Sequence, residues 1–309
     1  LSSTRDKGGL TYTQKRIRIL RQILANMGLN ETVTYSLIAK KDLNLYIEQP
    51  LEPIEVLMPL TEDRAVMRQS LLNGVLDAIS YNRARKLEDL AFFEIGNVYS
   101  KEKESLKLAI ALSGMFSSHL WKGMKQEASF YLLKGILESL CDKINISLSF
   151  TPYQGISTFH PGRCAAIVYQ NKRIGILGQL HPKFSKDRGL GTTVALEMDL
   201  TEILTDQKGF TYQSINKFPA ITRDLAIVCQ KDIPAEEISK LIKQTGKKTL
   251  TRVELFDVYT GDTIGIDEKS LAFKLVFEDS NKTLEAEEVD KLVGAILKRL
   301  DYVYKAKLR

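Results

Sequence analysis

Apolar residues recur at helical spacing near the start of the chain, within residues 12–28. Four of them are separated by three, four and three positions: Ile17, Leu20, Leu24 and Met27. This spacing places them on one face of an α-helix, and Gly28 follows where a helix C-cap is expected. The β-branched residues of the next segment, 31–37, predict a strand.

Helical and strand patterns follow one another through the middle of the chain without strict alternation. Helical spacing is found in 68–86 and 128–144, and strand patterns in 90–100, 106–114, 147–153, 159–184 and 194–200. Several strands are joined by hairpin-length turns, and the helices lie between groups of strands. The pattern therefore predicts an α+β fold, in which helices pack against an antiparallel sheet.

The last hundred residues predict the order β-α-β-β-α-β. The strands are 223–229, 250–259, 269–279 and 302–309, and the helices are 233–246 and 283–300. Thr283 is the expected N-cap of the second helix, with Lys298 and Arg299 in its last turn, and Leu255 and Val258 are expected in the core. This order is the ferredoxin-like unit, whose sheet keeps one face free of helices.

Composition and charge narrow the class of protein. The chain has 309 residues, 44% of them hydrophobic and 27% charged, which is typical of a globular protein and long enough for two domains. The net charge of +6 lies mostly before residue 213 and is compatible with an RNA partner without requiring one. No apolar run approaches the roughly 18 residues of a membrane span, so we expect no membrane contact.

The N-terminal sequence and the cysteines indicate the cellular compartment of the protein. The N-terminus is polar and has no secretory signal, and it begins with Leu1 rather than Met, so we interpret the chain as a piece of a longer protein. Cys141, Cys164 and Cys229 are far apart and fit no zinc spacing. We therefore expect free thiols in a cytoplasmic protein, and no metal site.

Two of the three histidines, His160 and His181, lie in the predicted hairpin 159–184, and each is followed by proline. They are expected near the open end of this hairpin. Two histidines without a third ligand are weak evidence for zinc, and a following proline favours extended backbone and the end of a regular element. A structural role is therefore the favoured interpretation.

Three motifs in the last hundred residues carry a family resemblance: "KFPAITRDLAIV", "ELFDVYTG" and "KSLAFKLVFEDSNKTLEAEEVD". Together they resemble the anticodon-binding domain at the end of the bacterial phenylalanyl-tRNA synthetase beta chain. Upstream, "GLTYTQKRIRILRQILANMGLNETVTYSL" and "FFEIGNVY" resemble the catalytic-like module of the same chain. The resemblance implies a class II synthetase-like module at 1–214 and a ferredoxin-fold anticodon-binding domain at 215–309, without the front domains of that subunit.

The resemblance also implies that the first module has no catalytic residues. Class II enzymes hold the ATP α-phosphate with an arginine in a strand, and the counterpart here, "VYSKE", has Ser100 at that position, although Glu102 remains. A neutral hydroxyl cannot replace a bidentate guanidinium against phosphate. Around 194–204 the sequence has no Gly-x-Gly followed by arginine. ATP and magnesium are therefore implied for the whole enzyme, and no cofactor for this chain.

The partners that the resemblance implies are a catalytic alpha subunit, in an alpha2beta2 heterotetramer, and phenylalanine tRNA. In class II relatives the first helix and strand form the subunit interface, so residues 15–37 are expected to contact the alpha chain. This chain alone is expected to be inactive, while supporting ATP-dependent attachment of phenylalanine to tRNA.

Four residues are candidate RNA contacts. Tyr259 matches the family's aromatic residue that stacks on an anticodon base, and Ser270 matches a residue that hydrogen-bonds the same base. Arg309 matches a basic position near the RNA. Arg223 either faces RNA or supports the fold through an ion pair.

A second function remains open, a structural or protein-interaction module without RNA contact. Tyr259 and Ser270 favour the RNA-binding interpretation, because both residue types suit recognition of a base. An independent small-molecule enzyme is disfavoured by Ser100 and by the absence of a nucleophile–histidine–acid set, a P-loop or a dinucleotide turn from the sequence.

Overall fold

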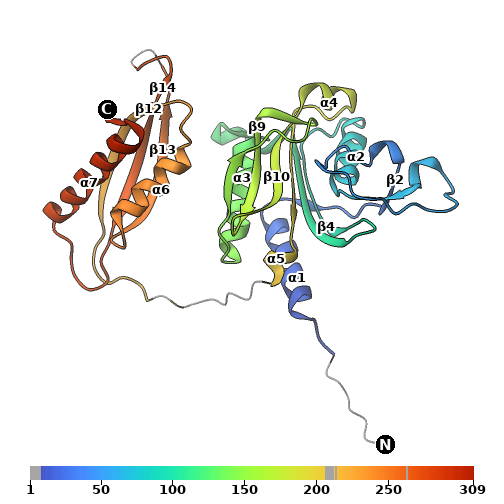
Figure 1. Cartoon of the computed structure of the whole chain (residues 1–309), viewed down its shortest axis with the longest axis horizontal. Coiled ribbons are helices and arrows are strands. Elements are labelled where there is room, and N and C mark those ends of the chain that lie inside the picture. The colour runs from blue at the N-terminus through green and yellow to red at the C-terminus, as the bar shows by residue number, and fades with distance from the viewer. Residues whose placement is uncertain (1–7, 206–211, 213, 262–263) are drawn as a thin grey trace, which may run out of the picture. The chain divides into compact units, whose positions relative to one another are not determined.

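The computed structural model describes residues 8–205, 212, 214–261 and 264–309. Its contacts divide the chain into unit 1, Leu1–Phe210, and unit 2, Thr211–Arg309. Figure 1 shows the helices and strands of both. Each unit combines a sheet with helices, which confirms the predicted α+β class.

Unit 1 is built on a seven-stranded sheet in the order β1-β4-β5-β11-β10-β9-β8. Its strands are β1 (Asn30–Glu31), β4 (Leu90–Tyr99), β5 (Glu104–Ser113), β8 (Ser149–Pro152), β9 (Phe159–Tyr169), β10 (Lys172–Leu180) and β11 (Thr193–Asp199). Neighbouring strands are antiparallel, except that the edge strand β1 is parallel to β4. The predicted antiparallel sheet is thus confirmed for all pairs but this one.

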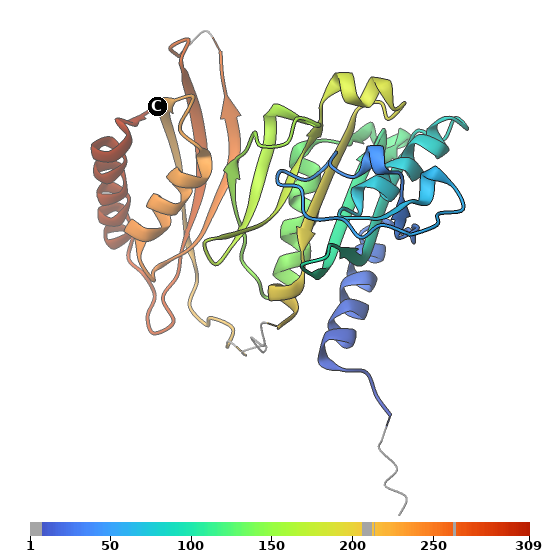
Figure 2. The ribbon, with the colours of Figure 1, turned by 45° about the vertical axis from the view of Figure 1, so that its right-hand side comes forward.

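Helices pack on both faces of this sheet, because its central strands are apolar on both sides. In β5, Leu108 and Ile110 face a core shared with α1 (Tyr12–Asn26), α3 (Phe130–Lys143) and α5 (Thr201–Thr205). The alternate residues Ala109 and Ala111 face α2 (Leu72–Arg83). Figures 1 and 2 show these helices on either side of the sheet, with α4 (Pro182–Asp187) at its end.

The predicted first helix is present as α1. Thr11 and Gln14 form a capping box at its start, and Gly28 follows its end with φ +92°. Leu20 and Leu24 of the predicted stripe are buried. The spacing of apolar residues therefore located this helix correctly.

The predicted strand 31–37 is wrong for most of its length. Only Glu31 belongs to β1, and β2 (Leu37–Ile38) starts at the far end and pairs with β3 (Val66–Met67). Between them the Arg68 guanidinium donates hydrogen bonds to the carbonyl oxygen and hydroxyl of Thr34. A side chain from a distant segment thus replaces a neighbouring strand, and local β-propensity cannot reveal this.

Short elements complete unit 1. A separate hairpin is formed by β6 (Met115–His119) and β7 (Met124–Glu127). The 3-10 helices are η1 (Lys40–Asp42), η2 (Glu62–Arg64) and η3 (Leu120–Lys122). These elements extend from the seven-stranded sheet rather than joining it.

The histidine hairpin is formed by β9 and β10, which pair from Phe159–Leu180 at the open end to Tyr169–Lys172 beside the turn. His181 is the N-cap of α4, where its Nδ1 atom accepts from the Lys183 amide at 3.3 Å. His160 Nδ1 accepts from the Gly162 amide at 3.0 Å. Both histidines therefore organise local backbone, although β9 continues through His160 and its proline, contrary to the expected break.

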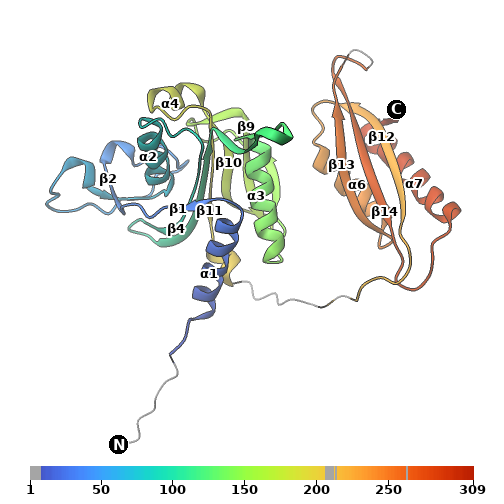
Figure 3. The same ribbon diagram turned by 180° about the vertical axis from the view of Figure 1, so that it is seen from behind.

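Unit 2 has the sheet order β13-β14-β12-β15, the arrangement of a ferredoxin-like βαββαβ fold. Its elements are β12 (Ile221–Gln230), α6 (Ala235–Gly246), β13 (Leu250–Tyr259), β14 (Glu268–Phe277), α7 (Ala286–Tyr304) and β15 (Lys307–Leu308). Both helices pack on one face of the sheet, and Figure 3 shows the unit from the other face. The predicted order of elements is confirmed.

Details at the end of unit 2 differ from the prediction. Helix α7 is capped by Glu285 rather than Thr283 and makes no side-chain capping bond. It continues to Tyr304, so Lys298 and Arg299 are not in its last turn, and the closing strand is only two residues long. Lys305 ends the helix in the left-handed conformation, with φ +55°, a stop that its residue type does not predict.

Within the part of the chain that the structure describes, all the helices are too short or too polar to cross a membrane. The three cysteines are buried free thiols.

Candidate nucleic-acid interface

The sheet of unit 2 has one face without helices, here called the open face (Figure 3). Along β12, Leu225, Ile227 and Cys229 point into the core beneath α6 and α7. The alternate residues therefore point to the open face. Strand pairing aligns Val228 with Ser270, and Ser270 with Tyr259, so the latter two residues lie side by side on this face.

Arg309 joins this pair from the opposite edge of the sheet. Its backbone amide donates to the Ala226 carbonyl at 3.0 Å, which extends the β15–β12 pairing by one residue. Its guanidinium carbon lies 4.8 Å from the centre of the Tyr259 ring, and its Nη1 donates to Ser270 Oγ at 3.5 Å. Three of the four predicted RNA contacts thus form one cluster, here called the Tyr259 cluster.

The three members of the Tyr259 cluster differ in accessibility. Tyr259 is partly exposed, whereas Ser270 has only 2% of its surface exposed. Because the guanidinium of Arg309 touches both residues, its side chain covers the serine hydroxyl. A base can reach that hydroxyl only after the Arg309 side chain moves.

Gly261 allows the tyrosine to pack against the loop that follows β13. A Cβ atom added at Gly261 would lie 2.4 Å from the Tyr259 phenol oxygen. A larger residue would therefore displace the ring or the loop. The glycine thus leaves room for the aromatic ring of the cluster at this position.

Arg223 is separated from the other candidates by the sheet itself. It alternates with Asp224 and Ala226 and shares the helix-covered face with Leu225. Its Nε donates to the Asp290 carboxylate of α7 at 2.9 Å. This contact matches the second alternative for Arg223, an ion pair that supports the fold.

The expectation that Leu255 and Val258 belong to the core is wrong. Both are exposed, Val258 to 55%, together with the neighbouring Phe256. They lie on β13, an edge strand with a neighbour on one side only, and a bulge between Leu255 and Asp257 interrupts its pairing. Apolar residue type alone therefore misplaced them.

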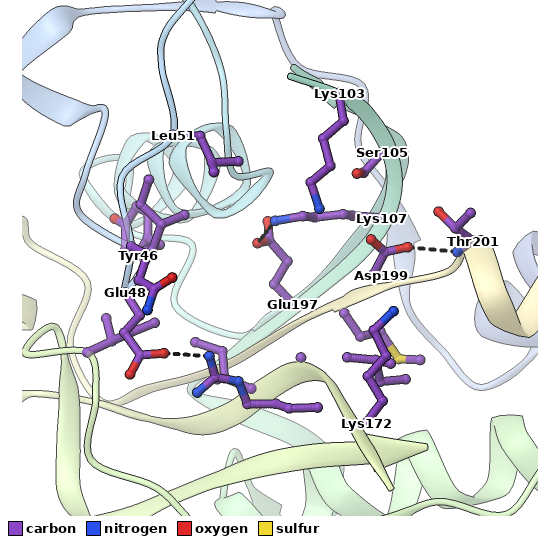
Figure 4. A pocket seen from close by; sticks show the side chains of 18 of the residues that line it. Tyr46, Glu48, Leu51, Lys103, Ser105, Lys107, Lys172, Glu197, Asp199 and Thr201 are labelled. Atoms are coloured by element: carbon purple, nitrogen blue, oxygen red, sulfur yellow. Dashed lines mark hydrogen bonds and ion pairs between the residues drawn. The ribbon is translucent and has the colours of Figure 1, made fainter. Parts of the chain in front are cut away.

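Unit 1 contains a cavity of about 570 Å³ (Figure 4). Its walls come from the segment 46–51, from β5, β10 and β11, and from the start of α5. Its size suits a small molecule. Whether the first module can hold a nucleotide here therefore depends on the charges of the side chains that line the cavity.

Three of the four lysine and arginine residues that line this cavity are paired with carboxylates; the fourth is Lys103. Lys107 lies 2.8 Å from Glu197, and Figure 4 shows this pair in the cavity wall. Two further ion pairs, Arg173–Glu48 and Lys172–Glu202, join its walls. A cation that is already paired is a poor ligand for phosphate, because the anion must compete with its carboxylate.

Ser100 lies next to this cavity, in a pocket of about 80 Å³ that shares Lys103 and Lys107 with it. Its hydroxyl donates to the Lys103 carbonyl and accepts from the Lys103 amide, which closes the turn between β4 and β5. When the hydroxyl directs its single proton to the Glu102 carboxylate instead of the Lys103 carbonyl, that hydrogen bond lowers the pKa of the Glu102 carboxyl. Ser100 thus serves the turn and offers no positive charge.

Exposed apolar residues precede both of the paired strands β2 and β3. They are Val33 and Tyr35 before β2, and Leu57, Met58 and Leu60 before β3. Arg64, which follows the second segment, places its guanidinium over the Tyr35 ring of the first and donates to the Leu37 carbonyl. The sequence analysis missed the second segment, although its run "VLMPL" was a readable signal. We call these five residues the β2–β3 apolar surface.

The sequence matches two family models. Residues 1–200 match the model described as "Phenylalanyl tRNA synthetase beta chain CLM domain". Residues 216–309 match the model described as "Ferredoxin-fold anticodon binding domain". Together the two matches account for nearly the whole chain.

Curated relatives agree with these matches. The chain is 38% identical over 311 residues to the phenylalanine–tRNA ligase beta subunit of Geobacillus kaustophilus, covering 98% of this chain and 39% of that protein. It is 36% identical over 312 residues to the beta subunit of Bacillus subtilis, with the same coverage. For that of Onion yellows phytoplasma, identity is 39% over 296 residues, 95% of this chain and 36% of the relative. The chain therefore spans about two fifths of these relatives.

Proposed function

The chain belongs to the phenylalanine–tRNA ligase beta subunit family, and on this premise we propose that it docks a catalytic alpha subunit and binds the anticodon of phenylalanine tRNA. In this proposal the chain supports ATP-dependent attachment of phenylalanine to tRNA within a cytoplasmic alpha2beta2 enzyme. ATP and magnesium act at the alpha subunit. Residues 1–214 form an inactive catalytic-like module, and residues 215–309 form the anticodon-binding domain.

One observation carries the RNA-binding part of the proposal. Tyr259, Ser270 and Arg309 come from three separate segments, and they meet on the one sheet face that the helices leave open. An aromatic ring beside a guanidinium suits an unpaired base with its phosphate, through stacking and charge. Arg223 has a fold-supporting role in this account, through Asp290.

Arg309 has two successive roles in the proposed complex. In the free chain its guanidinium occupies the space beside Tyr259 and Ser270 where a base would bind. Anticodon binding displaces it, which exposes the serine hydroxyl, and its charge then pairs with the RNA backbone. Because guanidinium pairs well with phosphate, the displaced side chain keeps a favourable partner.

The isolated chain is expected not to form phenylalanyl-adenylate. Ser100 gives no charge to hold the α-phosphate, and Lys107, Lys172 and Arg173 in the adjoining cavity are paired with carboxylates. The measurement is ATP–pyrophosphate exchange with phenylalanine present. A sample reconstituted with the alpha chain is the positive control, and exchange by this chain alone at a comparable rate would contradict the proposal.

Docking of the alpha chain is expected to use the exposed side of α1 together with the β2–β3 apolar surface. Ile19 of α1 is 49% exposed, although Leu20 beside it is buried. Replacing Ile19 by aspartate should weaken co-purification with the alpha chain about tenfold or more, since an interface would then bury an unpaired carboxylate. The same change at Ile266, an exposed isoleucine of unit 2, is the matched control. If both variants retain the alpha chain equally, the interface lies elsewhere.

A further inference from the structure

The β6–β7 hairpin of unit 1 exposes the chain's only tryptophan. Trp121 lies in the tip, 83% exposed, next to the exposed Met124. Its surroundings hold no core that would bury it, because β6 and β7 form their own two-stranded sheet. A large aromatic side chain left in solvent in this way marks an interaction site.

The tip of the hairpin is positively charged. Lys122 and Lys125 are exposed, and His119 pairs with Met124 across the strands. Within 115–127 the one acidic residue is Glu127, at the end of β7 beside the base of the hairpin. The Lys122 ammonium lies 4.8 Å from the centre of the Trp121 ring, so one cation already sits where a phosphate beside a stacked base would need it.

The hydrogen bonds that the structure describes between the hairpin and the rest of unit 1 lie at its base. The Ala128 amide donates to the Gly114 carbonyl at 2.8 Å, and the Met115 amide donates to the Asp89 carboxylate at 2.7 Å. Beyond these contacts, Ser118 and His119 of β6 and all four residues of β7 are exposed. The tip therefore presents Trp121 and the lysines without a neighbouring element over them.

We propose that this hairpin is a second RNA contact, at which an unpaired base stacks on Trp121 while adjacent phosphates pair with Lys122 and Lys125. Aromatic stacking combined with lysine charge is how proteins hold single-stranded nucleic acid without reading its sequence. A protein partner would suit the aromatic and apolar residues equally well, but the two exposed lysines, with Glu127 paired to Met115 at the base, favour a polyanion at the tip. The inference rests on the proposed tRNA binding and adds a contact in the other unit.

The single tryptophan makes the contact directly measurable. Titrating the 309-residue chain with an unmodified phenylalanine tRNA transcript should quench Trp121 emission in a saturable way and protect it from acrylamide. Trp121→Ala should weaken tRNA binding about tenfold, by loss of one stacked base. Trp121→Phe keeps an aromatic face and should retain most of the parental affinity for tRNA.

The lysine contacts are tested separately, by the salt dependence of tRNA binding. The double change Lys122→Gln with Lys125→Gln should reduce the slope of log affinity against log salt by about 1.4–1.8, since each of the two phosphate contacts contributes about 0.7–0.9. Tyr302→Ala is the control, because Tyr302 is similarly exposed and has the cation of Arg299 nearby, but lies on α7. This variant should bind tRNA like the parent.

Distinct outcomes separate this inference from the proposed function. Unchanged Trp121 emission and acrylamide access at saturating tRNA, or parental affinity in Trp121→Ala, would overturn the hairpin contact while leaving the Tyr259 cluster untouched. An emission change on adding the alpha chain but not tRNA would overturn it in favour of a protein contact. Parental affinity in Tyr259→Ala, with binding still weakened in Trp121→Ala, would instead count against anticodon binding.

Discussion

Replacing Arg68 by methionine should lower the free energy of unfolding of unit 1 by about 3–5 kcal/mol, the cost of leaving a buried charge without its partner. The Arg68 and Glu94 side chains are only 5% and 4% exposed, and their Nη1 and Oε1 atoms lie 2.7 Å apart. Arg68 also donates to the Asn97 carbonyl at 3.0 Å. The substitution therefore removes the cation beside the buried Glu94 carboxylate, whose Oε2 keeps its hydrogen bond from the Thr34 hydroxyl, and it removes a donor to the Asn97 carbonyl.

The free energy of unfolding can be followed by chemical denaturation, with hydrogen exchange of β4 and β5 assigning the transition to unit 1. Arg64→Met is the matched control, because Arg64 is exposed, and its effect should stay within about 1 kcal/mol. Combining Arg68→Met with Glu94→Leu should recover much of the loss, since replacing both charges removes the unpaired carboxylate. A loss below about 1 kcal/mol in the single variant would contradict this assignment.

Tyr259→Ala should weaken binding of the phenylalanine anticodon stem–loop by about 1–3 kcal/mol, through loss of one stacking surface. Tyr259→Phe keeps the ring and should bind nearly as the parent does. Ser270→Ala should cost less, about 0.5–1.5 kcal/mol, the value of one neutral hydrogen bond. Competition titrations with a labelled stem–loop measure all three.

The expected order of effects follows from the geometry of the Tyr259 cluster. Ser270 is buried beneath Arg309 in the free chain, so its bond to a base must repay the displacement of the arginine. Circular dichroism should confirm that each variant stays folded. Parental affinity of Tyr259→Ala at low salt would remove the stacking role and leave the interaction-module alternative.

The elements that the sequence predicted well are those with a regular apolar periodicity. Alternating apolar residues located β12 and β14, and helical spacing located α1 and α7, because these patterns record which face is buried. The segment 31–37 failed because its hydrogen bonds go to several distant groups, the Phe93 carbonyl, the Arg68 backbone amide and the Arg68 side chain, rather than to one neighbouring strand. No periodicity within the segment carries that information.

The candidate site was predictable to a similar degree. The family motifs pointed to Tyr259, Ser270 and Arg309, but not to the covering of Ser270 by a side chain from the far edge strand. That contact depends on strand order, which brings β15 beside β12. The exposure of Val258 likewise follows from the edge position of β13 and its bulge, which residue type does not encode.

The central claim is that the open face of unit 2 recognises the anticodon, and one titration tests it most directly. The parent chain is titrated with the phenylalanine anticodon stem–loop and with a stem–loop of equal length whose anticodon is altered, over a range of salt. The account predicts tighter binding of the matched stem–loop at every salt concentration, with parallel salt slopes, because phosphate contacts are shared and only base contacts differ. Equal affinities for the two stem–loops would contradict it.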